Sequence, residues 1–293
     1  MIPQTLRQQG WNTTHVLLAI LLACAGVWLT LDAWHEIFEI AMKDQEASHI
    51  FLVPIVAVWM AHTRRIRLLR CPPGGFIIGP ILAGVGWLSL YIGSRHGYES
   101  LFHLGAVLIT VGLALGALGK YVFFRFLPAF LVLVFLVPVP GVIRQSLSIP
   151  LQHLGAQASQ ALLETLGKDV ERSGNVLQIN GVDVGVAEAC NGMRMVFALV
   201  LVSYAFAFSR PLQTWARITI LIASPAIALG MNVIRLSALA LLFGSETMGM
   251  YAEDIHRISG WLMLPICFFL LLGVVRALQW ALLPVNRYTL AYQ

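Results

Sequence analysis

The sequence predicts an all-α polytopic membrane protein with about eight transmembrane helices, an extracytoplasmic interfacial helix and a short β-ribbon. Apolar residues make up 58% of the 293 residues and charged residues only 11%, whereas soluble domains average about 25% charged residues. Several apolar runs approach the roughly 20 residues that a helix needs to cross the membrane. A soluble core could not bury so much apolar chain, so we expect residues 1–293 to form one integral membrane domain.

Eight apolar stretches give the expected helices. They cover residues 16–31, 50–62, 76–93, 101–118, 124–142, 191–208, 218–243 and 258–283. The first is expected to be a retained helix, because no small-residue cleavage pattern precedes the acidic segment 32–49. That acidic segment is expected to be an interfacial helix or loop. Pro138 and Pro140 should end the fifth helix, because proline lacks the N–H group that a helix interior requires.

The longest segment without an expected span is 143–189, an extracytoplasmic insertion that leads to Cys190. Apolar residues recur at helical spacing over 147–166, which predicts an amphipathic helix on the membrane surface. Asn180-Gly181 lies between two alternating stretches, 175–179 and 182–186, and this dipeptide is a strong hairpin signal. The insertion is therefore expected to contain an interfacial helix and a two-stranded ribbon.

Basic residues indicate the orientation. The net charge is +5, but the arginines lie mostly in short loops between apolar runs, where they act as topology signals and not as a nucleic-acid surface. A cluster of four is expected on the inside, together with both termini: Arg64, Arg65, Arg67 and Arg70. The insertion 143–189 and the loop before the eighth helix then lie on the extracytoplasmic side of the cytoplasmic (inner) membrane.

Three polar residues interrupt consecutive apolar segments. Cys190 stands at the start of the sixth helix, where unpaired N–H groups and the helix dipole favour a thiolate. Arg235 lies about 12 Å below the outer end of its helix at 1.5 Å per residue, and a charge inside an apolar helix usually has a function. His256 lies in the following loop, where it can fold over the same outer end.

These three side chains fit an acyl-transfer reaction. Cys190 would attack a carbonyl carbon, Arg235 would stabilise the oxyanion or the thiolate, and His256 would be the general acid and base. Supporting residues are expected beside them: Glu188, Asn191, Arg194 and Asn232. No spacing of cysteines, histidines or acids indicates a metal site, and no cofactor is expected.

Structural explanations stay open for each residue. Cys190 could be a buried thiol beside a helix cap, and Arg235 could pair with Glu188 or extend to the membrane surface. His49 and His96 are also expected on the outer side and could replace His256. The remaining cysteines are expected to be packing residues: Cys24, Cys71 and Cys267.

The stretch Glu188-Ala-Cys-Asn-Gly-Met-Arg194 resembles the Ala-Cys-(Ser/Asn)-Gly-hydrophobic-Arg motif of the exosortase/archaeosortase family. Asn232-Val-Ile-Arg235 is similar to that family's Asn-x-x-Arg motif, and His256 falls at its third catalytic position. Residues 48–54 resemble its Ser-His-Gly-x-Leu-x-Pro stretch, with Ile50 in place of glycine. Residues 135–140 also match, so the resemblance extends over about 30–283.

The resemblance implies a membrane thiol protease of transpeptidase type, in which Cys190 is the nucleophile, Arg235 the oxyanion or thiolate partner and His256 the acid/base. Its substrates would be exported proteins with a C-terminal sorting signal (PEP-CTERM type): a Pro-Glu-Pro-like motif, a transmembrane helix and a basic tail. The other expected partners are membrane lipids and an acceptor nucleophile that the sequence does not identify; nucleic acid is not expected.

Two alternatives remain. One is a protease with the same residues that releases its product to water. The other is a transporter, or a polysaccharide or lipid assembly protein, in which Arg235 and Arg194 bind an anionic ligand and Cys190 is incidental.

Overall fold

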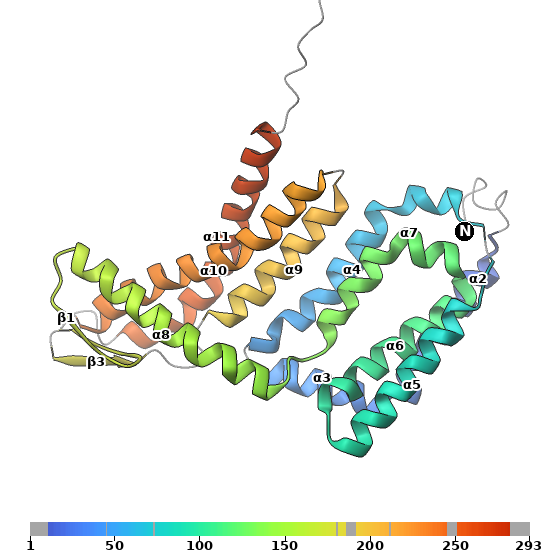
Figure 1. Ribbon diagram of the computed structural model, residues 1–293, viewed down its shortest axis with the longest axis horizontal. Helices are drawn as coiled ribbons and strands as arrows, with labels where there is room; N and C mark the ends of the chain where they lie inside the picture. The colour runs from blue at the N-terminus through green and yellow to red at the C-terminus, as the bar shows by residue number, and fades with distance from the viewer. Residues whose placement is uncertain are drawn as a thin grey trace, which may run out of the picture. The chain divides into compact units, whose positions relative to one another are not determined.

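The computed structural model describes residues 11–44, 46–72, 74–179, 181–185, 192–210, 212–244 and 251–281. Within these ranges, eleven side chains lie outside the description: those at 69, 70, 185, 252, 253, 256, 257, 261, 264, 279 and 281. The chain divides into two compact units, residues 1–147 and 148–293 (Figure 1). That these form one domain stays a prediction.

The described part of the first unit is helical. Its elements are α2 (Thr13–Leu29), α3 (Leu31–Lys43), η1 (Glu46–Phe51), α4 (Leu52–Thr63), η2 (Arg65–Arg70), α5 (Ile78–His96), α6 (Glu99–Leu118), α7 (Lys120–Leu131) and η3 (Val132–Leu136). The chain bends by 80° between α2 and α3. α3 buries only Ala33, Ile37 and Ala41, which share one face at helical spacing. Most of the acidic segment is therefore the amphipathic helix that was one of its two expected forms.

Glycines bring α5 and α6 side by side (Figure 1). Gly79, Gly86 and Gly93 recur at intervals of seven along α5, and all three are buried. A Cβ atom on Gly86 would lie 2.9 Å from the carbonyl oxygen of Gly105 in α6, and one on Gly112 would lie 2.8 Å from that of Gly79. Small residues at helix contacts let backbones approach closely in a membrane, where lipid tails are as apolar as leucine and no hydrophobic force drives helices together.

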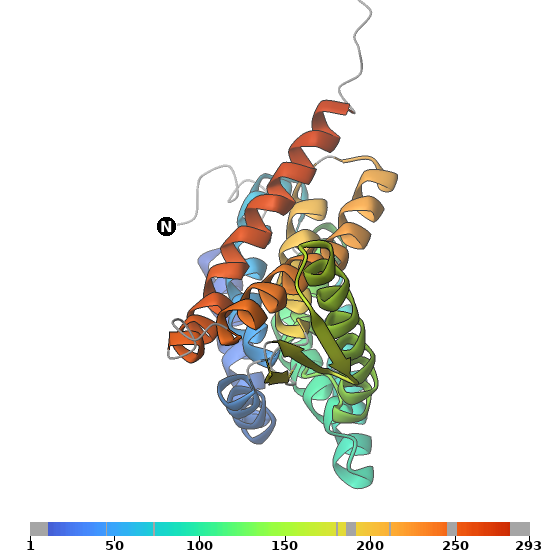
Figure 2. The ribbon, with the colours of Figure 1, turned by 90° about the vertical axis from the view of Figure 1, so that its left-hand side faces the viewer.

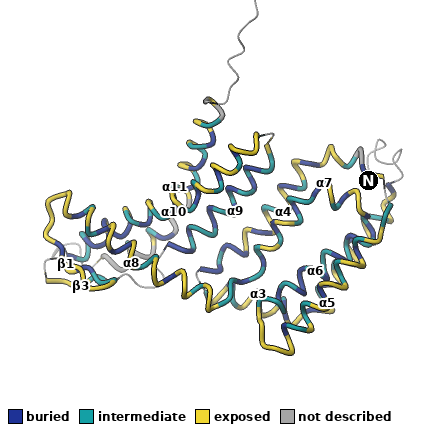
Figure 3. Tube along the Cα trace, viewed as in Figure 1, coloured by how far each residue is buried: buried dark blue, intermediate teal, exposed yellow. Residues whose placement is uncertain are grey.

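Large apolar side chains cover much of the outer surface of the first unit. Trp28, Ile55, Val58 and Trp87 are between 62% and 76% exposed, and exposed stretches alternate with buried ones along the helices (Figure 3). A soluble protein rarely exposes apolar surface on this scale. Lipid contact explains it.

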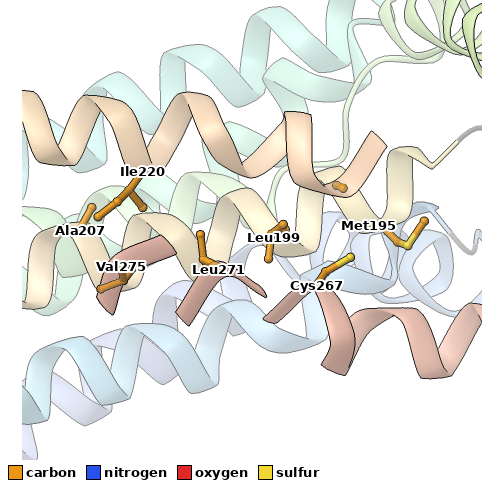
Figure 4. Close-up of a cluster of buried hydrophobic side chains, with 8 residues drawn as sticks. Met195, Leu199, Ala207, Ile220, Cys267, Leu271 and Val275 are labelled. Atoms are coloured by element: carbon orange, nitrogen blue, oxygen red, sulfur yellow. The ribbon is translucent and has the colours of Figure 1, made fainter. Parts of the chain in front are cut away.

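The second unit contains most of α8 (Gly141–Thr165), followed by a sheet and three helices: α9 (Met193–Ser209), α10 (Thr214–Phe243) and α11 (Ala252–Ala281). One apolar cluster holds the three helices together (Figure 4). Leu199 of α9, Ile220 of α10 and Leu271 of α11 lie in it, each at most 3% exposed. This packing fixes the helices that carry the sequence motifs.

The sheet has three antiparallel strands in chain order: β1 (Val170–Ser173), β2 (Val176–Ile179) and β3 (Val182–Gly185). The predicted hairpin at Asn180-Gly181 is confirmed, and Gly181 has a φ of 78°, as its turn requires. The prediction of two strands was wrong, because β1 also pairs with β2. Its sequence Val-Glu-Arg-Ser has no apolar alternation, since only Val170 is buried.

Four helical stretches are long and apolar enough to cross a membrane: Glu46–Thr63, Glu99–Leu118, Thr214–Phe243 and Ile258–Leu278. Two bent pairs raise the number to at most six in the described chain: Thr13–Leu29 with Leu31–Lys43, and Lys120–Leu136 with Gly141–Thr165. The protein is thus a multi-pass membrane protein, but the count of eight spans is not confirmed. The expected fifth helix over 124–142 is interrupted, because η3 ends at Leu136 and α8 begins at Gly141, on either side of Pro138 and Pro140.

The close glycine contacts between α5 and α6 predict that a large side chain lowers the stability of the fold only at the glycines in contact. Gly86→Leu would push a side chain into the α6 backbone, which cannot move aside, and overpacking of this kind costs about 1–3 kcal/mol. Gly84 lies on the same helix with nothing within 4 Å of its Cβ position, so Gly84→Leu is the matched control. We expect a lower thermal unfolding temperature in detergent for Gly86→Leu only; equal temperatures for the two variants would contradict close α5–α6 packing.

Candidate functional site

The predicted site residues belong to α9, α10, α11 and the segment before α9. Glu188, Cys190 and Asn191 lie outside the described residues. The description resumes at Gly192, the residue before α9. Gly192 is therefore the first described residue after Cys190.

Gly192 packs against Asn232 of α10. Its φ is 82°, a left-handed conformation that glycine adopts without strain, and it turns the chain into α9. A Cβ atom at this position would lie 3.1 Å from both Cγ and Nδ2 of Asn232. Asn232 is 2% exposed, so a buried polar side chain from α10 lies directly against the backbone two residues after Cys190.

Arg235 lies one turn after Asn232 on the same helix, at a spacing that puts both on one face. It is 3% exposed, and its Nε is buried without a hydrogen-bond partner in the described chain. Burying a guanidinium donor without a partner is costly. Its predicted alternative partner, Glu188, lies outside the described residues, so that pairing stays a prediction.

A second guanidinium meets Arg235 beside Gly260 of α11. A Cβ atom on Gly260 would collide with Nη2 of Arg194, and Nη1 of Arg235 lies 3.7 Å from the same point. Gly260 is itself buried. Arginines from α9 and α10 thus converge where α11 has no side chain. Two positive charges this close to one point repel each other. A negative charge close to both guanidinium groups would therefore lower the electrostatic energy of this arrangement.

His256 lies one turn before Gly260 in α11. The sequence placed His256 in a loop, which was wrong, because α11 begins at Ala252. The apolar stretch that could cross the membrane begins at Ile258, as expected. Acidic residues stand in the first turn of the observed helix, and acids there stabilise a helix by interacting with its dipole. The side chain of His256 lies outside the description; its backbone lies at the i, i+4 spacing that puts it on the Gly260 face.

The other cysteines have the surroundings of packing residues. Cys71 is fully buried, and its thiol donates to the carbonyl oxygens of Arg67 and Tyr121 at 3.3 and 3.7 Å. Burial raises the pKa of the Cys71 thiol, against a smaller opposite effect of Arg125, so little thiolate forms there at neutral pH. Cys267 is buried in the apolar cluster of Figure 4, whereas Cys24 is exposed on α2.

His49, an alternative to His256, lies in the first unit. It is 5% exposed, and its Nδ1 lies 3.0 Å from the carbonyl oxygen of Glu46. Arg144 at the start of α8 forms ion pairs with Asp44 and Glu46. These contacts tie the His49 turn to the beginning of α8. His96, the other alternative, is exposed.

Sequence reasoning missed Gly260. Its only local signal is a glycine inside a helix, one turn after His256, and such a residue often has a packing or functional reason. The same reasoning left the role of Arg194 open, and the structure puts its guanidinium beside that of Arg235.

Comparison with known families supplies the identity of the chain. Residues 34–273, most of the sequence, match the family described as transmembrane exosortase. Comparisons with curated proteins and with solved structures give no match. The matched range includes Cys190, Arg235 and His256, and the family was named above from these residues. The chain therefore belongs to the transmembrane exosortases, a family of membrane protein-sorting enzymes.

Proposed function

We propose that this exosortase is a cysteine endopeptidase of transpeptidase type that cleaves the C-terminal sorting signals of exported proteins. The observation that carries the proposal is the convergence of Arg194 and Arg235 beside Gly260. This pair lies close to the start of the helix that follows Cys190 and one turn from the backbone of His256. An acyl-transfer site needs a nucleophile, an oxyanion partner and an acid/base in such proximity.

The proposed reaction has two halves, formation of a thioester on Cys190 and its transfer to an acceptor. The Cys190 thiolate attacks the scissile carbonyl carbon, and the carbonyl electron pair becomes an oxyanion next to Arg235. The oxyanion then collapses, the C–N bond breaks, and His256 donates a proton to the leaving amine. The substrate is left as a thioester on Cys190. An acceptor nucleophile, deprotonated by His256, attacks the thioester and releases Cys190.

The burial of Arg235 suits this chemistry. Arg235 is 3% exposed, and an electrostatic contact in a water-poor site is stronger than the same contact in water. The positive charge would also favour the thiolate form of Cys190 as the nucleophile. Asn232 would hold the Gly192 turn in place, which positions Cys190 without direct contact with the reacting atoms.

The membrane position of the site suits a substrate that carries its own transmembrane helix. Arg235 lies eight residues before the end of α10 at Phe243. With the orientation expected from the arginine-rich loops, this end is extracytoplasmic. A substrate helix held inside by a basic tail would present its motif at the same level.

The same guanidinium pair supports a second candidate function. Two convergent arginines also suit an anionic lipid or polysaccharide, as in a transporter or assembly protein. In that function the thiol of Cys190 has no role. The two functions therefore differ in their response to a change at Cys190.

Removing the nucleophile tests the enzyme. In cells that co-express an exported protein with a C-terminal sorting signal, Cys190→Ala should abolish cleavage of the signal, as seen by immunoblotting, with unchanged enzyme in the membrane. Cys24→Ala, at an exposed cysteine, should cleave normally. Full cleavage by Cys190→Ala would reject the thiol mechanism and favour the transporter or assembly function.

A single methyl group tests the guanidinium pair. Gly260→Ala would displace the Arg194 guanidinium and crowd that of Arg235; since one oxyanion donor is worth about 10²–10³ in rate, we expect cleavage at least about tenfold slower. Gly273→Ala is the control, because it lies in the same helix with nothing within 4 Å of its Cβ position. Equal cleavage rates for two equally stable variants would show that the positions of these guanidinium groups do not matter.

A further inference from the structure

The two edges of the three-stranded sheet have different surroundings. β1 forms one edge and β3 the other, with β2 between them. Figure 2 shows the strands lying along α8. Val170 of β1 and Val182 of β3 both pair with Ile179 of β2, one on each side. Val170 is 4% exposed, whereas Val182 is 41% exposed. At this end of the sheet the β1 residue is therefore buried and the β3 residue is exposed.

One side chain of α8, that of Gln160, bonds to the β1 edge. Nε2 of Gln160 donates a hydrogen bond to the carbonyl oxygen of Val170 at 3.4 Å. Nε of Arg172 donates to Oε1 of the same Gln160 at 3.1 Å. An added strand could not pair there without displacing these contacts.

The β3 edge offers backbone groups to a partner. Ile179 and Val182 close the two-residue turn of the hairpin, and such a closing pair exchanges both of its hydrogen bonds. In the antiparallel ladder, the N–H and C=O groups of Val182 and Val184 then point to β2. Those of Asp183 and Gly185 point to the opposite side. Among the described residues, no further strand pairs with β3.

The sheet is fixed next to the candidate site. Leu177 and Ile179 of β2 pack against Leu236 and Ala240 of α10 in one buried cluster. Leu236 directly follows Arg235. β3 ends at Gly185, five positions before Cys190. The open edge thus belongs to the strand that precedes Cys190 in the sequence and to a sheet held by the helix that carries Arg235.

We propose that the substrate segment at the scissile bond docks as a fourth strand on the open edge of β3. This inference rests on the proposed function and names how that enzyme holds its substrate. An extended peptide would pair with the outward N–H and C=O groups of Asp183 and Gly185, and an apolar side chain would cover Val182. Strand addition of this kind derives affinity from main-chain hydrogen bonds and specificity from alternate side chains.

Proline at the edge tests the main-chain hydrogen bonds. Asp183→Pro removes an N–H that points away from β2, so the β2–β3 ladder keeps its own bonds. Asp183→Ala removes the same carboxylate and keeps the N–H. We expect signal cleavage about fivefold or more slower for Asp183→Pro than for Asp183→Ala, as for one lost hydrogen bond. Equal cleavage rates would overturn the proposal.

A disulfide scan tests the docking in a catalytically silent background. Asp183→Cys in a Cys190→Ser enzyme would be combined with substrates that carry single cysteines along the segment around the motif. Cross-linking is expected at every second substrate position, because side chains alternate between the faces of a sheet. Glu171→Cys is the matched control: Glu171 and Asp183 both pair with Gln178, on opposite sides. The β1 edge should not cross-link, because Gln160 already bonds the Val170 carbonyl there. Equal cross-linking at both edges, or none at Asp183→Cys, would contradict strand addition.

The two proposals fail separately. If Cys190→Ala abolishes cleavage while Asp183→Pro and Asp183→Ala behave alike, the enzyme stands and the docking is wrong. If Cys190→Ala cleaves normally, the proposed function fails, and the cross-linking pattern alone decides whether β3 binds the peptide.

Discussion

The second unit is built around one energetic problem, a buried guanidinium in an apolar helix. Arg235 is 3% exposed, and its charge is tolerable only where polar groups or an anion can reach it. Glycines next to Arg235 and Asn232 leave space for these polar side chains. Gly192 lets the backbone before α9 lie against Asn232, and Gly260 makes room for both arginines. The apolar cluster of α9, α10 and α11 below the site supplies the packing that holds these approaches in place.

Glycine has a different use in the first unit. Along α5 and α6 it removes side chains so that two backbones can touch, which is a means of stabilisation where lipid supplies no hydrophobic force between helices. At the site, glycine admits charged side chains instead. The first use recurs at intervals of seven and shapes a whole interface, whereas the second occurs at single positions. A glycine that fits no periodic seam, such as Gly260, is therefore the more informative one about function.

Local signals in the sequence predicted much of the fold, and contacts between distant segments account for what they missed. Hydropathy located most helices, and Asn180-Gly181 located one hairpin, because both depend on neighbouring residues. β1 was missed because its polar residues form a strand only through pairing with β2. The break around Pro138 and Pro140 was expected from the prolines, whereas the change from α7 to the 3-10 helix η3 at Val132 was not. Arg235 and Asn232 could be selected from their unusual place in an apolar helix, but the meeting of Arg194 and Arg235 at Gly260 depends on the packing of three helices. The Cys190–Arg235–His256 site and the expected orientation stay predictions.

The attachment of the sheet to α10 would link the proposed substrate docking to the proposed chemistry. A strand added to β3 would be positioned by backbone hydrogen bonds, and the sheet is in turn positioned by Leu236 and Ala240, on the turns of α10 that carry Arg235. The same helix, α10, would then fix the positions of both the substrate carbonyl group and the Arg235 guanidinium group. Small displacements of a reacting group cost large factors in rate, so a short path from the docking edge to the charged group matters more than a large contact area. Main-chain pairing also places few demands on substrate sequence, which would suit the proposed cleavage of different exported proteins.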